Sequence, residues 1–125
     1  MVAGVGVDLV SVSRLSRLLC RVPSLEKKIL SPRERDLPVR SKAGNIAAKE
    51  AMLKSGLLTS FKSFRDIEIC REFGGKPKAK SVNISRIGSI TGENIHISIS
   101  YLNDTALALV VHQEPSHENQ KPDGL

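Results

Sequence analysis

A strict alternation of apolar and polar residues near the end of the chain constrains the fold more than any other feature. Within Asn94–Ser100, isoleucines occupy every second position and alternate with one histidine and two serines. Successive side chains of a strand point to opposite faces, so this pattern predicts a strand with one buried face. The turn residues Leu102–Asp104 lead into the Ala/Leu/Val-rich run Thr105–His112. We expect this run to return antiparallel to the first strand, as a central strand buried on both faces.

The chain opens with a second strand-like segment, an apolar run over residues 2–7 that ends at Asp8. Gly4 and Gly6 lie within the run, and glycine in a strand is typical of a place where another backbone approaches closely. We therefore expect a buried strand that ends in an acid. An ionised carboxylate in such a place needs a cation or hydrogen bonds to compensate the loss of water.

The first helix is expected to follow this strand, with Ser11 or Ser13 as its cap and Pro23 at its end. Its apolar residues recur at the helical spacing i, i+3, i+4, i+7, which predicts a core face. They are Leu15, Leu18, Leu19 and Val22. A neighbouring face carries three arginines, Arg14, Arg17 and Arg21. Without interleaved acids they form either a solvated basic face or the docking site of an anionic partner.

Two further helices are expected in the middle of the chain. Ser31 and Glu34 have the spacing of a capping box and predict a helix that Pro38 cuts short. A longer helix is expected over residues 42–55, with Gly56 at the position that follows a helix C-terminus. Together with the strands, these helices predict an α+β fold in which an antiparallel sheet packs against a few helices.

A period of two returns from Phe61, where Ile67 and Ile69 alternate with polar residues. The segment Gly74–Pro77 predicts a turn, after which a lysine-rich strand returns. Residues 1–112 are expected to form one domain, and residues 113–125 lack periodicity and are expected to be a disordered tail.

The composition narrows the classes of function. The 125 residues are 40% hydrophobic and 26% charged, which is typical of a globular domain. No apolar stretch approaches the ~18 residues of a membrane span, and a secretory signal is not expected. The net charge of +6 favours an acidic or phosphate-rich partner. Aromatic residues make up only 3%, which leaves few surfaces for stacking nucleic acid bases. The two cysteines lack metal spacing and predict a reducing compartment.

A second acid, Glu50, lies in the middle of the longest predicted helix among small and apolar residues. Two carboxylates that converge from a strand and a helix would form a hard-oxygen site of the kind that Mg²⁺ uses with substrate phosphates. Lys54 follows Glu50 at i+4, the favoured orientation for an ion pair. Taken alone, such a pair is most often a surface salt bridge of little energetic value.

Six short motifs occur in order across residues 2 to about 112. They are Gly4–Val10 followed by Arg14, Ile29–Ser31 with Glu34, Ala47–Ala51 with Lys54, Asp66–Ile69, Gly75–Pro77, and Ile97–Ser100 before the last strand. The acid-ended strand, the Ala-Ala-Lys-Glu-Ala helix and the Gly-Lys-Pro turn are specific in combination. In this combination the chain resembles the bacterial-type holo-acyl-carrier-protein synthases, a family of 4′-phosphopantetheinyl transferases.

The resemblance implies transfer of 4′-phosphopantetheine from coenzyme A to a serine of apo acyl carrier protein, as in fatty acid biosynthesis. It also implies the 4′-phosphopantetheinyl transferase fold and a homotrimer with active sites at the subunit interfaces. By the same resemblance, Asp8 and Glu50 would hold Mg²⁺, Lys54 would contact the phosphates, and Glu50 or a metal-bound water would help to deprotonate the serine. The three helix arginines Arg14, Arg17 and Arg21 would bind the acidic carrier protein.

Coenzyme A would contact a larger set of residues by this resemblance. The set comprises Lys54, Gly75, Lys76, Pro77, Ser98, Ser100 and Tyr101. From the residues alone, cross-strand pairing explains the two serines equally well, and turn formation explains Gly75 and Pro77.

The chain departs from the family at two positions. Asn45 stands where the family usually has an arginine that binds the nucleotide 3′-phosphate, and Arg40 or Lys42 are candidates to replace it. Tyr101 stands where the family often has a histidine. A degenerate member that binds carrier protein or coenzyme A without transferring the group is therefore an alternative. A basic nucleic-acid-binding domain is a third hypothesis. The expected compartment is the cytoplasm, with the mitochondrial matrix as the alternative.

Overall fold

The computed structural model describes residues 1–82 and 94–114. In order, its elements are β1 (Val2–Ser11), α1 (Val12–Arg21), α2 (Ser24–Ile29), the 3₁₀ turn η1 (Glu34–Asp36), α3 (Val39–Lys54), the 3₁₀ helix η2 (Phe61–Asp66), β2 (Ile67–Arg71), β3 (Pro77–Ser81), β4 (Ile95–Leu102) and β5 (Thr105–Gln113). The predicted α+β class is confirmed. Of the expected tail, the first residue belongs to β5, and residues 115–125 lie outside the described part of the chain.

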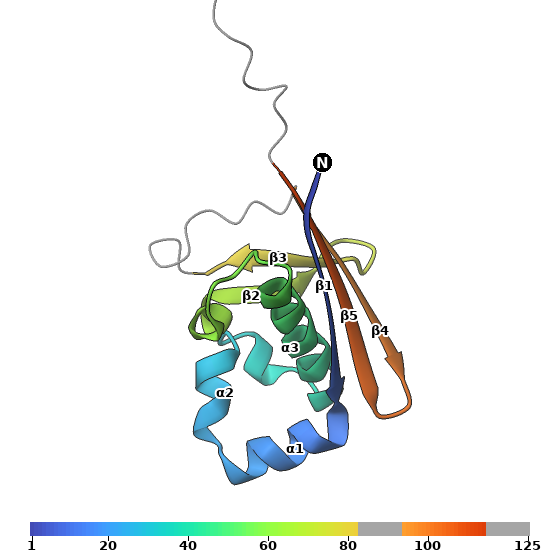
Figure 1. The fold of residues 1–125 in the computed structure, drawn as a ribbon. Coiled ribbons are helices and arrows are strands. Elements are labelled where there is room, and N and C mark those ends of the chain that lie inside the picture. Colours follow the sequence, from blue (N-terminus) through green and yellow to red (C-terminus); the bar gives the residue numbers. More distant parts are fainter. Residues whose placement is uncertain (83–93, 115–125) are drawn as a thin grey trace, which may run out of the picture.

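The predicted hairpin of β4 and β5 forms the centre of a three-stranded antiparallel sheet of order β1-β5-β4. Its turn holds Asn103 at a φ of 52°. The central place of β5 is as predicted, but the described part of the chain buries only one of its faces. All the helices lie on one side of this sheet (Figure 1), so Leu107 and Leu109 on the other side stay 38% and 39% exposed.

The first strand is longer than predicted, because β1 continues to Ser11 and Asp8 lies inside it. The prediction that its glycines admit another backbone is confirmed. A Cβ atom on Gly6 would lie 1.9 Å from the carbonyl oxygen of Ala51, and one on Gly4 would lie 2.0 Å from that of Ser55. The backbone of α3 therefore rests directly on β1, which brings the C-terminal half of α3 next to Asp8.

Ser11 caps the start of helix α1, because its hydroxyl accepts a hydrogen bond from the Arg14 amide at 3.2 Å. The predicted core face is only partly formed. Leu15 is buried, whereas Leu18 and Val22 remain exposed by 37% and 42%. The spacing of apolar residues identifies a helix face correctly, but it does not say whether another element covers that face. Here much of it faces open space beside α3.

The predicted capping box is present in its hydrogen bonds. The Ser31 amide donates to Glu34 Oε1 at 2.9 Å, and the Glu34 amide donates to Ser31 Oγ at 3.4 Å. The box starts only the single turn η1 and no longer helix. The expected period-two segment likewise begins as the 3₁₀ helix η2, and its strand starts at Ile67.

Helix α3 starts at Val39, a few residues before the predicted start, and Gly56 follows its end with a φ of 86°, as predicted. The helix lies between the three-stranded sheet and the β2–β3 hairpin, with α1 and α2 beyond its N-terminal half (Figure 1). Its residues Ala43 to Ala48 are all buried, so α3 forms the centre of the core. Within the described residues, no helix is long and apolar enough to cross a membrane.

Candidate active site

The predicted acids Asp8 and Glu50 meet where α3 rests on β1. Lys54 extends along β1, and its Nζ donates to Asp8 Oδ1 at 2.5 Å and to the Val7 carbonyl oxygen at 3.3 Å. The side chain of Asp8 is 10% exposed, whereas that of Lys54 is 57% exposed. The ion pair that Lys54 forms is therefore with the strand acid and not with Glu50, its neighbour on the helix.

The Glu50 carboxyl group is half-buried beside Asp8. Burial raises the pKa of Glu50 to about 8, and hydrogen bonding with Asp8 and the negative charge of Asp8 add to this effect. Lys54 acts in the opposite direction. The Asp8 carboxylate in turn raises the pKa of Lys54. Two carboxyl groups thus face each other with too little positive charge nearby to keep both ionised.

A divalent cation fits this arrangement. Asp8 Oδ2 is buried and has no hydrogen-bond partner among the described residues, so one acid oxygen stays available. Asp8 and Glu50 offer the carboxylate oxygens that Mg²⁺ prefers. No group of three or more histidine, cysteine or acidic side chains that could hold a metal occurs in the described chain. Water and substrate oxygens would have to supply the other ligands, which is usual for Mg²⁺ beside phosphates.

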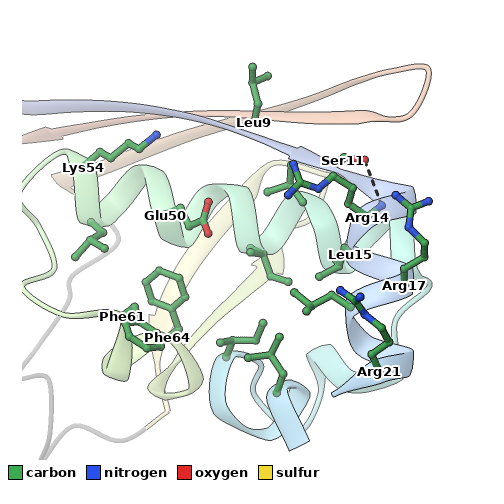
Figure 2. A pocket seen from close by; sticks show the side chains of 16 residues that line it. Leu9, Ser11, Arg14, Leu15, Arg17, Arg21, Glu50, Lys54, Phe61 and Phe64 are labelled. Atoms are coloured by element: carbon green, nitrogen blue, oxygen red, sulfur yellow. Dashed lines mark hydrogen bonds between the residues drawn. The ribbon is translucent and has the colours of Figure 1, made fainter. Parts of the chain in front are cut away.

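Glu50 and Lys54 also border a cleft of about 770 Å³ between α3, α1, α2 and η2. Figure 2 shows Lys54 reaching towards β1 and the three arginines of α1 on the opposite wall. Arg14, Arg17 and Arg21 all line the cleft, as do Leu15 and Leu18 of α1. Phe61 and Phe64 of η2 lie below Glu50 and form an apolar floor. The sequence did not identify these phenylalanines as part of a site.

Apart from Lys54, the residues expected to contact coenzyme A lie elsewhere in this chain. Gly75 and Lys76 belong to the turn between β2 and β3, and Pro77 begins β3. Ser98 and Ser100 project from the exposed face of β4. None of these five residues lines the cleft, so one chain does not bring them to Glu50. Their role remains a prediction.

Tyr101 also belongs to β4 but points to the opposite, inner face. Its hydroxyl lies 2.2 Å from the position that a Cβ on Gly44 would take, so the ring packs tightly against α3. The guanidinium group of Arg40 stacks over this ring, with 4.7 Å between its Cζ and the ring centroid. The Tyr101 side chain therefore points to the opposite face of β4 from the side chains of Ser98 and Ser100.

Asn45 has a different surrounding from the one that the sequence suggested. It is 3% exposed, and its Nδ2 donates to Glu34 Oε2 at 3.0 Å and to the Ile69 carbonyl oxygen at 3.2 Å. Lys42 is held in an ion pair with Glu26. Of the two candidates to replace the missing arginine, only Arg40 remains exposed.

Asn45 belongs to a buried polar network that sequence reasoning did not identify. The network centres on Lys49 and Glu34, which are 0% and 1% exposed. The signal was available in part, because Asn45, Lys49 and Met52 follow the spacing i, i+4, i+7 of one buried helix face. A lysine on such a face requires a buried acceptor, but the sequence does not say which acid provides it.

The comparisons with known proteins agree with the family that the sequence motifs indicate and with the fold. The signature of the 4′-phosphopantetheinyl transferase superfamily matches residues 4–110. A holo-[acyl-carrier-protein] synthase of Clavibacter sepedonicus is 37% identical over 113 residues, which cover 89% of this chain and 95% of that protein. The corresponding protein of Geobacillus kaustophilus is 39% identical over 122 residues, covering 89% of this chain and 88% of its own.

Solved structures show the same likeness. The crystal structure of a holo-[acyl-carrier-protein] synthase from Neisseria meningitidis superposes with a TM-score of 0.75 at 31% identity, over 91% of this chain and all of that one. A Bacillus anthracis holo-(acyl-carrier-protein) synthase in complex with coenzyme A (3′,5′-ADP) gives a TM-score of 0.68 at 28% identity, over 90% of this chain and 96% of that one.

Proposed function

The chain belongs to the 4′-phosphopantetheinyl transferase superfamily as a holo-acyl-carrier-protein synthase, and on this premise we propose how its cleft carries out the reaction. The enzyme transfers 4′-phosphopantetheine from coenzyme A to a serine of apo acyl carrier protein. Adenosine 3′,5′-bisphosphate leaves. The observation that carries the proposed mechanism is the contact of Asp8 with Glu50 and Lys54, two residues that line one cleft.

The transfer exchanges one phosphorus–oxygen bond for another. The serine oxygen forms a bond to the phosphorus that carries pantetheine, and the bond from that phosphorus to the nucleotide breaks. Such a reaction requires positioning and neutralisation of charge more than covalent chemistry by the protein. The serine must also lose a proton, and the carboxylate of Glu50 borders the cleft where the serine would enter. We assign Glu50 as the group that accepts it.

Asp8 and Glu50 are the residues that would hold Mg²⁺. When bound, the ion would neutralise the diphosphate of coenzyme A and favour the ionised forms of both acids. Lys54 adds a second positive charge at the same place, and its 57% exposure leaves the ammonium accessible to a phosphate oxygen. The unpartnered Oδ2 of Asp8 supports this assignment.

The arginine wall supports the choice of the second substrate. Arg14, Arg17 and Arg21 line the same cleft as Glu50, so a partner that covers them also reaches the reacting groups. An acidic protein would be attracted to this wall, and electrostatic steering would raise its rate of association. We infer that acyl carrier protein docks on α1 with its serine directed towards Glu50.

The exposed side of the three-stranded sheet supports a homotrimer. Leu107 and Leu109 of β5 lie beside a row of exposed apolar residues on β1, namely Val5, Val7 and Leu9. A contiguous apolar surface of this kind is typical of a protein interface. We propose that neighbouring copies cover it. A neighbouring copy would also supply the coenzyme A contacts at Gly75, Lys76, Pro77, Ser98 and Ser100, which one chain does not bring to the cleft.

A mass measurement tests the proposed transfer. The protein is incubated with apo acyl carrier protein, coenzyme A and Mg²⁺, and the carrier should gain about 340 Da, the mass of phosphopantetheine. Removal of Mg²⁺ with EDTA should abolish the gain, and added Mg²⁺ should restore it. A protein that binds carrier or coenzyme A but leaves the carrier mass unchanged would be a degenerate family member.

A further inference from the structure

Helix α3 carries a lysine that is completely enclosed by protein. Lys49 donates to the carbonyl oxygens of Ile29 at 2.9 Å and Phe64 at 2.7 Å, and to Oε1 of Glu34. An ammonium group has three protons, so each has an acceptor. Burial lowers the pKa of Lys49, and the Glu34 carboxylate opposes this effect. A complete set of acceptors therefore surrounds the Lys49 ammonium group.

The partner carboxylate is equally well satisfied. Glu34 Oε1 accepts from the Ser31 amide at 2.9 Å as well as from Lys49. Its Oε2 accepts from Asn45 Nδ2 at 3.0 Å and from the Ile69 amide at 3.1 Å. Four donors from α3, β2 and the segment before η1 therefore meet at one carboxylate. No polar atom of this pair remains available for a ligand.

The place of the Lys49 acceptors connects this pair to the cleft. Ile29 is the last residue of α2 and Phe64 belongs to η2, and the side chains of both line the cleft. Lys49 itself directly precedes Glu50. Adjacent residues of a helix point about 100° apart, so Lys49 is anchored on one side of α3 while Glu50 faces Asp8 on another. One ammonium group thus joins two parts of the cleft wall to the residue next to Glu50.

We propose that Lys49 and Glu34 are positioning residues for phosphopantetheine transfer. They fix the end of α2 and the phenylalanine floor of η2 relative to Glu50. The carrier serine can then approach the coenzyme A phosphorus opposite the leaving oxygen, with its proton directed towards the Glu50 carboxylate. This inference rests on the proposed function. It differs from a role in stability alone because it predicts a loss of turnover that exceeds the loss expected from weaker folding.

The expected kinetic effect follows from the position of the pair. Lys49 is enclosed by protein, so its replacement leaves Lys54, the proposed phosphate contact, and Asp8, the proposed Mg²⁺ ligand, in place. The KM for coenzyme A should then change by less than about twofold. Misplacement of reacting groups by about 1 Å costs up to about 10²-fold, so we expect kcat to fall by about tenfold or more.

The test compares two network variants with one core variant. Lys49→Met removes the charge at similar length, and Glu34→Asp keeps the charge but withdraws the carboxylate by one methylene group. Ile97→Ala is the control, because Ile97 is 6% exposed on the inner face of β4 and does not line the cleft. Urea unfolding, measured at the assay temperature, establishes that every variant used is folded under the assay conditions. Should Lys49→Met not fold, Glu34→Asp provides the same comparison with a smaller effect.

Two measurements decide the outcome. Steady-state kinetics should show a lower kcat and an almost unchanged KM for coenzyme A in the network variants, and normal values in Ile97→Ala. Without substrates, amide hydrogen exchange should accelerate in residues 61–66 of the network variants and not in the control. Equal loss of kcat in the control, or unchanged exchange in residues 61–66, would overturn the proposal. An inactive wild-type protein would instead refute the proposed function and, with it, this inference.

Discussion

Two lysines of α3 form ion pairs with acids from other elements, and the two pairs differ in almost every respect. Lys49 is 0% exposed, and each of its three protons has an acceptor, while both carboxylate oxygens of its partner Glu34 accept hydrogen bonds. Lys54 is 57% exposed, and its partner Asp8 keeps one buried oxygen that has no hydrogen-bond partner in residues 1–82 and 94–114. The Lys49–Glu34 pair is fully hydrogen-bonded within the protein. The Lys54–Asp8 pair, in contrast, retains an acceptor oxygen that a bound ion could use.

This contrast separates the part of α3 that determines structure from the part that performs chemistry. A buried pair with every partner in place contributes to a unique arrangement of the core, and breaking it leaves an uncompensated charge. An exposed pair contributes little to stability and can exchange its partner. Glu50 lies beside the Lys54–Asp8 pair, and its pKa is raised by burial and by the neighbouring Asp8 carboxylate.

The largest effect should come from breaking the complete pair. Lys49→Met leaves the Glu34 carboxylate buried without its cation and removes one donor from the carbonyl oxygens of Ile29 and Phe64. We expect the free energy of unfolding to fall by about 3–5 kcal/mol, measured by urea denaturation. The matched variant Lys54→Met should leave the urea midpoint almost unchanged, since its ammonium is exposed. Similar losses of stability in both variants would show that the two pairs are energetically alike.

Catalysis should respond in the opposite way. Asp8→Asn removes the negative charge that pairs with Lys54 and half of the proposed Mg²⁺ site. We expect the rate of transfer to fall on the order of 10²–10³-fold, because charge stabilisation in a preorganised site is worth this much. The urea midpoint should hardly move. The exposed Asp36, which lies outside the cleft, offers the control Asp36→Asn. Unchanged transfer by the Asp8 variant would remove Asp8 from the site.

A smaller effect is expected at the arginine wall, where charge acts on a partner. Arg14→Ala should raise the KM for acyl carrier protein by about 3–10-fold and leave the KM for coenzyme A unchanged, because the lost charge reduces steering. Added salt should raise the wild-type KM for acyl carrier protein towards that of the variant, because salt screens the charge of the arginines. Arg33, an exposed arginine outside the cleft, provides the control Arg33→Ala. A change confined to coenzyme A would contradict this role.

The smallest effect concerns an exposed carboxylate that is satisfied by the protein. Asp104 accepts from both Ser13 Oγ at 2.6 Å and the Ser13 amide at 3.0 Å, and from Ser11 Oγ at 2.9 Å. The Ser13 hydroxyl, followed by that of Ser11, lowers the pKa of Asp104 below its ordinary value of 3.8. A depressed pKa of an acid contributes stability above the unfolded pKa, and this contribution is lost as the pH falls through the folded pKa.

Thermal unfolding of Asp104→Asn tests this exposed contact. The variant should have a slightly lower Tm than the wild type at pH 7, and the difference should shrink as the pH falls below 3.8. A difference in Tm that persists unchanged at low pH would mean that shape, and not the charge of Asp104, holds the start of α1.

Local patterns in the sequence correctly predicted the elements around the Lys54–Asp8 pair. Glycines in a strand predicted the contact of β1 with α3, and the alternating isoleucines predicted the hairpin of β4 and β5. The acids of β1 and α3 could then be expected to meet. These predictions succeeded because each depends on neighbouring residues or on one contact between two elements.

Features that need three or more elements could not be predicted in the same way. Lys49 finds acceptors on α2, η1 and η2, and no spacing along the chain indicates that these segments meet. The apolar face of α1 was predicted to be core, but Leu18 remains exposed because none of the described residues covers it. The outer side of β5 is similar. Periodicity shows which face is apolar, and only the assembled fold shows what lies opposite.

The contact at Gly6 has a consequence for how this site could vary. A Cβ there would lie 1.9 Å from the Ala51 carbonyl oxygen, so any other residue would lift the helix off the strand. The distance between Asp8 and Glu50 is therefore set by the direct contact of the β1 and α3 main chains, which only a glycine at position 6 allows. A design that admits a larger ion could begin at Gly6, although Gly6 is not one of the proposed ligands.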